Sequence, residues 1–158
     1  MGKPQNIKEF INTFNSIKEV NWKLEFFGAG EEFDSIKDLE NEQLSVFEHL
    51  PRNELYEKTK DIPVALISLD KDITVEGFPG KTFDYLSMNK VLICFANSDS
   101  AVSKFIDKFE LGFTIDPNDK TSMGTIFDKL NDQSLLLNYQ KNINLSLIHI
   151  SEPTRPER

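Results

Sequence analysis

The sequence predicts an α/β fold in which a parallel β-sheet carries helices on both faces. Short apolar segments with the character of strands alternate about five times with amphipathic segments of helical spacing, and short loops join them. Two of the apolar segments, at residues 64–69 and 91–95, are continuous, as in parallel strands that are covered on both faces. This order of elements requires right-handed crossovers between parallel strands.

The first half of the chain predicts three helices, each followed by a strand. Helical or alternating spacing of apolar residues places helices at residues 7–17, 31–40 and 54–60 and strands at 22–27, 44–47 and 64–69. Asn6 and Asn53 are the expected N-caps of the first and third helices.

The second half continues the alternation after a loop at residues 70–80. It predicts strands at 91–95 and 112–115 and helices at 81–88, at 101–109 and from residues 121 and 134 onward. Asp99 or Ser100 is the expected cap of the helix that begins at residue 101. Together these elements predict a Rossmann-like open sheet. In such a sheet, ligands bind beyond the carboxyl ends of the strands.

The composition is that of one soluble globular domain. The chain has 158 residues, of which 39% are hydrophobic and 28% are charged. Its net charge of −8 argues against a general nucleic-acid-binding protein, which needs a basic surface. The single cysteine, Cys94, reads as a small buried apolar residue and fits a reducing compartment. Because neither a signal peptide nor a membrane span is evident, the cytoplasm is the expected location.

Residues 145–158 differ in character from the rest of the chain. Residues 145–155 resemble the conceptual translation of a transposase adapter that is used in preparing sequencing libraries. This resemblance implies a folded domain at residues 1–144 and a non-native tail at 145–158, so His149 carries no functional claim. The alternative is a native arm whose Leu147, Ile148 and Ile150 dock on the domain.

Gly28 and Gly30 follow an expected strand, so a dinucleotide-binding loop must be considered. The third glycine of that motif would fall at position 33, which is Phe33. Glu31 and Glu32 would also repel a pyrophosphate. We therefore expect a tight strand-to-helix turn here and no nicotinamide or flavin site.

The loop before residue 81 has the features of an anion-binding site. Gly77 and Gly80 allow a ligand to approach the backbone closely, and the first amides of the next helix are free to bind it. Lys81 in the first turn opposes the helix dipole unless an anion is present. From these residues alone, a phosphate-bearing ligand and an ordinary loop are equally good interpretations.

Residues 75–93 resemble the donor-site signature of the retaining B-type glycosyltransferases, the large family four and its relatives. In that signature an acidic residue, a glycine-rich turn and a second acidic residue eight positions on precede an apolar strand, as Glu76 and Asp84 do here. Lys81 matches a Pro-x-Lys variant of the turn. Further similarity to the donor-binding domain follows in the same order at residues 2–7, 24–30 and 47–69.

The resemblance implies roles for the residues of this signature. Lys81, with the start of its helix at Gly80, would stabilise the departing diphosphate. Glu76 and the backbone amides of Gly77 and Phe78 would contact the sugar. The alternative for Glu76 is a solvated loop carboxylate.

Further substrate contacts are implied elsewhere in the chain. Asp84 would bind the ribose hydroxyls, although it stands where the family usually has the longer Glu; the alternative is an exposed helix carboxylate. Leu50 and Arg52 would border the base. Lys3 is the nearest candidate for the cation that grips the diphosphate from the first loop.

The activity that the resemblance implies is sugar transfer from a nucleotide-diphosphate donor, expected to be UDP-linked, to a glycan or lipid-linked acceptor in polysaccharide synthesis. It implies no metal and no resident cofactor. The acceptor would be recognised by an N-terminal domain outside this sequence, which could also contact a membrane surface. This portion alone is expected to be inactive.

A non-enzymatic module of the flavodoxin or receiver type is the alternative function. Such a module needs acidic residues clustered at strand ends, and Asp70 and Asp72 are the nearest candidates, without a second pair after an earlier strand. His49 beside Pro51 is interpreted as a structural loop residue, and no cluster has the spacing of metal ligands.

Overall fold

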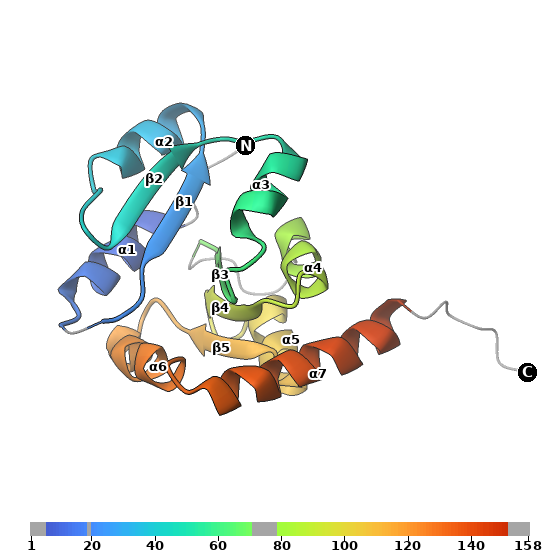
Figure 1. The fold of residues 1–158 in the computed structure, drawn as a ribbon. Coiled ribbons are helices and arrows are strands. Elements are labelled where there is room, and N and C mark those ends of the chain that lie inside the picture. The colour runs from blue at the N-terminus through green and yellow to red at the C-terminus, as the bar shows by residue number, and fades with distance from the viewer. Residues whose placement is uncertain (1–5, 19, 71–78, 152–158) are drawn as a thin grey trace, which may run out of the picture.

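The computed structural model describes residues 6–18, 20–70 and 79–151 (Figure 1). Strands and helices alternate as the sequence predicts. Its elements are α1 (Ile7–Ser16), β1 (Leu24–Gly28), α2 (Gly30–Lys37), β2 (Leu44–Glu48), α3 (Arg52–Thr59), β3 (Val64–Ser68), α4 (Gly80–Ser87), β4 (Val91–Phe95), α5 (Ala101–Phe109), β5 (Gly112–Ile115), the short 3-10 helix η1 (Lys120–Ser122), α6 (Met123–Lys129) and α7 (Gln133–Ser151).

All paired strands are parallel, and they form two sheets. One sheet has the order β1-β2 and the other the order β3-β4-β5. The predicted α/β class and Rossmann-like arrangement are confirmed, but the strands of the described residues divide between two sheets where one open sheet was expected.

Helices cover both faces of the three-stranded sheet. The five residues of β4 are all buried, and their side chains point alternately to the two faces. On one face the ring of Phe95 lies 5.4 Å from that of Phe10 in α1. On the other face the sulfur of Cys94 lies 3.8 Å from the hydroxyl of Ser103 in α5. Cys94 is therefore the buried apolar residue that the sequence predicts.

The two-stranded sheet has its own, smaller core. Its buried members are Ile11, Ile36, Leu44 and Val46. Helix α1 contributes to both cores, because Phe10 and Phe14 belong to the larger cluster and Ile11 to the smaller one. One helix thus holds the two sheets together.

The expected helix caps are only partly correct. Ser100 caps α5, since its hydroxyl accepts a hydrogen bond from the Ser103 amide at 3.2 Å. Asn6 makes no cap bond; its backbone is left-handed, with φ 68°, and its side-chain amide donates to the Leu69 carbonyl at 3.1 Å. Asn53 lies inside α3, which begins at Arg52 after Pro51. Proline fixes a backbone angle compatible with a helix start, so α3 begins early.

Helix α7 extends into the predicted tail and ends at Ser151. Ile143 and Ser146 are buried, and Leu147 packs against the larger core, whereas Ile148 is 61% exposed. The non-native origin of residues 145–158 stays a prediction. Among the described residues, none of the helices has the length and apolar character that crossing a membrane requires.

Candidate functional site

Helices α3 and α4 approach each other, and each begins after the carboxyl end of the strand that precedes it. Helix α3 follows β2 of the smaller sheet, and α4 follows β3 of the larger sheet. Figure 1 shows the two helices side by side, and an ion pair joins them, with Arg52 Nη2 at 3.2 Å from Asp84 Oδ1. The edge on which the sequence places a ligand is therefore occupied by two helix starts, each of which carries partial positive charge.

The start of α4 lacks a side-chain cap, although the Thr82 amide donates to the Pro79 carbonyl at 2.9 Å. Its N-cap, Pro79, provides no side-chain cap bond, so no cap side chain satisfies the first amides of the helix. A Cβ placed on Gly80 would meet no heavy atom of the described residues within 4 Å. Lys81 and Gly80 are both exposed. These features fit the predicted anion site.

Three of the predicted site residues come together on this surface. Lys81 and Asp84 are both exposed and stand one turn apart on α4, so they lie on the same side of the helix. Arg52 reaches Asp84 from α3, although 32 residues separate them in sequence. The side chains of Arg52 and Asp84 are 87% and 55% exposed, so solvent and ligands have access to both.

Most of the other predicted residues cannot be placed relative to this group. Lys3, Glu76, Gly77 and Phe78 lie outside the described residues. Leu50 is half-buried in the loop before α3. The predicted contacts of these five residues with the sugar, base and diphosphate stay predictions.

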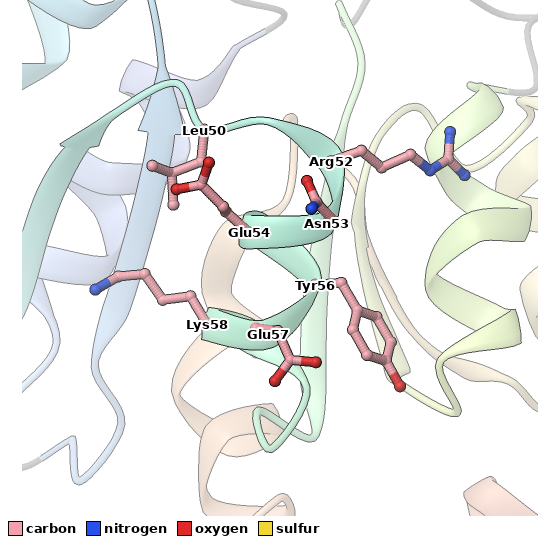
Figure 2. A pocket seen from close by; sticks show the side chains of 7 residues that line it. All are labelled: Leu50, Arg52, Asn53, Glu54, Tyr56, Glu57 and Lys58. Atoms are coloured by element: carbon pink, nitrogen blue, oxygen red, sulfur yellow. The ribbon is translucent and has the colours of Figure 1, made fainter.

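A broad, open hollow runs along α3, with a volume of about 1050 Å³. Its lining residues are Leu50, Arg52, Asn53, Glu54, Tyr56, Glu57 and Lys58. Figure 2 shows that Arg52 and Tyr56 extend toward α4, whereas Lys58 extends the other way, placing its ammonium 4.4 Å from the centre of the Phe47 ring. We locate the candidate site by the helix starts and not by this hollow, because exposed side chains form it and Lys81 and Asp84 do not line it.

Behind its exposed side, α4 packs on the larger core. Thr82 and Leu86, one turn apart, are fully buried, and within the described part of the chain Thr82 Oγ1 has no hydrogen-bond partner. Burial raises the pKa of Tyr85, and the charge of Asp84 adds to this effect. The spacing of Thr82 and Leu86 is the only sequence signal for this inward face.

A buried lysine that the sequence analysis missed fixes the other end of α3. Lys90 is 3% exposed, and its Nζ donates to the carbonyls of Thr59 and Ile62, both at 2.6 Å. Burial lowers the pKa of Lys90, and the charge of Asp61 partly opposes this shift. The ammonium binds the last carbonyl of α3, where the helix dipole is negative. Lys90 thereby positions α3 relative to β4.

Asp116 joins two loops at the carboxyl ends of β4 and β5. Its carboxylate accepts hydrogen bonds from the amides of Asn118 at 2.8 Å and Ser98 at 2.9 Å. These bonds lower the pKa of Asp116. Asp116 is another residue that sequence reasoning missed, because its partner Ser98 lies 18 positions away.

The alternative receiver-type site gains little from the structure. Asp72 lies outside the described residues. Among the residues the structure does describe, no three His, Cys, Asp or Glu side chains are grouped as metal ligands.

Comparison with known proteins gives one informative match. No protein-family model and no solved structure matches the chain. Over 134 residues the chain is 25% identical to the probable glycosyltransferase WbjE of Pseudomonas aeruginosa, a match that covers 82% of this chain and 34% of that protein. The chain therefore spans about a third of the length of this relative. The similarity supports a glycosyltransferase relationship for the chain.

Proposed function

We propose that this chain is the donor-binding portion of a hexosyltransferase that uses a nucleotide-diphosphate sugar, with UDP as the expected nucleotide. The acceptor is a glycan or lipid-linked sugar in polysaccharide synthesis. The observation that carries this proposal is the start of α4, which has no side-chain cap and bears Lys81 and Asp84 on one side, with Arg52 of α3 paired to Asp84. The similarity to a probable glycosyltransferase supports the reaction class.

Lys81 and the first amides of α4 would act on the leaving group. In sugar transfer the bond between the anomeric carbon and the phosphate oxygen breaks, and negative charge accumulates on the diphosphate. Donors that are already oriented toward this charge lower the barrier, because they need no reorganisation during the reaction. An ammonium next to a helix start combines a full and a partial positive charge in this position.

Asp84 and Arg52 would exchange partners when the donor binds. A carboxylate accepts hydrogen bonds from the two ribose hydroxyls, which would compete with Arg52 for Asp84. An exposed ion pair contributes only about 0–1 kcal/mol, so little free energy opposes this exchange. The released guanidinium is then free to contact the phosphates or the base.

Acceptor recognition and the rest of the catalytic machinery would be supplied by the remainder of the longer protein, at the cytoplasmic side of a membrane or in the cytoplasm. This portion then binds donor weakly and does not transfer sugar on its own. Transfer of sugar to an acceptor by the isolated chain would contradict this part of the proposal.

Calorimetric titration with UDP, GDP and ADP tests the site. Lys81→Ala should weaken the binding of the preferred nucleotide by about 1.5–3 kcal/mol, as for other charged hydrogen bonds, and Asp84→Ala should weaken it as well. Lys129→Ala is the matched control, because Lys129 is an exposed lysine at the end of α6. If a nucleotide binds and neither site variant changes its affinity, the site lies elsewhere.

A further inference from the structure

The two sheets present open edges. The Leu69 amide donates to the Phe95 carbonyl, and the Val91 amide donates to the Pro63 carbonyl, so the odd-numbered residues of β3 direct their backbone groups toward β4. Because these directions alternate along a strand, Val64 and Leu66 turn their amides and carbonyls away from β4. Strand β3 has no second neighbour among the described strands.

Strand β1 has an equivalent open edge. The Leu24 amide donates to the Gln43 carbonyl, so the even-numbered residues of β1 face β2. Glu25 and Phe27 then direct their backbone groups to the other side, where no described strand pairs with β1.

The sequence of β3 is unsuited to a permanent edge. Edge strands are normally protected by charges, proline or a bulge, since an unprotected edge promotes aggregation. Strand β3 reads Val-Ala-Leu-Ile-Ser, with no charge and no proline. A continuous apolar run of this kind is typical of an interior strand of a parallel sheet.

The two open edges belong to one body. Helix α1 packs into both cores, and Leu24 of β1 packs against both as well. The start of α1 is tied to the carboxyl end of β3 by the Asn6 side chain, which donates to the Leu69 carbonyl. From there α1 leads to β1. In a β-α-β unit a helix begins where the preceding parallel strand ends, so a strand that preceded α1 would end beside β3 and pair with β1.

Trp22 gives an independent indication of a missing partner. It lies two residues before the start of β1, yet its side chain packs against the larger core, which belongs to the other sheet. Its Nε1 is buried and has no hydrogen-bond partner among the residues that the structure describes. A buried indole N–H normally finds an acceptor, and a backbone between the sheets would offer carbonyls.

We propose that β1 and β3 accept one further parallel strand between them, supplied by the segment of the full-length protein that directly precedes Met1. This strand joins the two sheets into one, with the order β2-β1-strand-β3-β4-β5. The glycosyltransferase relative, of which this chain spans about a third, is a longer protein. The inference does not depend on the proposed sugar transfer.

The test adds a strand and measures backbone hydrogen exchange by NMR. The probe is the chain with the apolar extension Val-Leu-Ile-Val-Thr fused before Met1, compared with the chain alone. The edge amides of Val64, Leu66, Glu25 and Phe27 should exchange at least about tenfold more slowly with the extension, as for amides that gain a ladder hydrogen bond of about 1.4 kcal/mol. The amides of Ala65 and Ile67, which already face β4, should change much less.

The matched control carries the extension Val-Pro-Ile-Pro-Thr. Proline lacks the amide that donates to a ladder and is not tolerated in a central strand, so this version should not pair with both edges at once and should protect at most one pair of the edge amides. The same pair of sequences, added as free peptides, repeats the comparison if the fused chain aggregates.

Three outcomes would overturn the proposal. The first is equal protection of Val64 and Ala65 in the chain alone, which would mean that the edge is already closed. The second is that both extensions protect the edge amides equally. It is also met if neither extension protects them, whether fused to the chain or added as a free peptide. The third is edge protection that rises with protein concentration as the chain dimerises, which would make a second copy the partner.

Discussion

The two sheets use the same parallel pairing but differ in what stabilises them. Strand β4, the centre of the larger sheet, is at most 2% exposed along all five residues, and helices lie on both of its faces. The smaller sheet buries four side chains, one of which belongs to α1. Its other face carries a half-buried stacked pair, Phe27 and Phe47, with ring centres 5.0 Å apart. The larger sheet is therefore held by its own core, and the smaller one by its attachment to α1.

This difference bears on the candidate site, because the site spans the two sheets. Arg52 lies on the helix that follows the smaller sheet, and Asp84 lies on the helix that follows the larger sheet. A change that loosens the smaller sheet should therefore disturb the site without unfolding the larger sheet.

The largest expected effect is the removal of a ring from the larger core. Phe95→Ala should lower the free energy of unfolding by about 3–5 kcal/mol, because it leaves a cavity beside Phe10. Ile36→Ala in the smaller core should cost less, about 2 kcal/mol, since fewer buried neighbours surround it. Denaturant unfolding followed by circular dichroism measures both. Equal costs would show that the two cores are equally well packed.

The next effect concerns the lysine that fixes the end of α3. Lys90→Met should cost about 1–3 kcal/mol, because two buried carbonyls lose their donor. Lys60→Met is the control, since Lys60 is exposed and pairs with Glu57 at the surface; it should stay within about 0.5 kcal/mol of the wild type. Thermal unfolding compares the two. If Lys90→Met left the stability unchanged, the position of α3 would not depend on the hydrogen bonds that Lys90 donates.

A smaller effect depends on pH. The pKa of Asp116 is lowered in the folded state, so its carboxylate contributes stability above the unfolded value near 3.8, and this contribution is lost as the pH falls through the folded pKa. Asp116→Asn should therefore cost about 1 kcal/mol at pH 7 and progressively less below pH 4. Denaturant unfolding across this range gives the difference. A cost that does not depend on pH would show that the carboxylate charge is not responsible.

The smallest expected effect on stability comes from the ion pair of Arg52 and Asp84, which joins α3 to α4. A double-mutant cycle of Arg52→Ala and Asp84→Ala should give a coupling of about 0–1 kcal/mol, because both side chains are largely exposed. The same cycle on nucleotide binding should show a larger coupling if both residues contact the ligand. A stability coupling above this range would show that the ion pair stabilises the packing of α3 against α4.

Sequence reasoning succeeded where a pattern is local. The apolar runs of β3 and β4 and the helical stripe of α1 were placed because their spacing repeats over several residues. It failed where a partner that is distant in the sequence determines what a side chain contacts. Asn6 was expected to cap α1, but its side chain bonds to Leu69, 63 positions away. Lys90 is buried because the end of α3 lies beside it. The residues next to Lys90 in the sequence give no indication of this contact.

The candidate site shows the same limit. The anion site proposed at Lys81 rests on a local pattern, the glycines and the helix start around it, and stays a prediction. The approach of Arg52 to Asp84 could not be predicted, because it depends on how α3 and α4 pack across the edges of two sheets. The division into two sheets could not be predicted either, since alternation gives the order of strands and not their pairing.

The most direct test of the account is an NMR titration of the isotopically labelled chain with UDP. We predict that the largest amide shifts fall at Gly80, Lys81, Thr82 and Asp84 and at Arg52 on the facing helix, with small shifts along α6 and α7. Saturable shifts that are strongest on α6 or α7, and absent at the start of α4, would contradict the assignment of the diphosphate site.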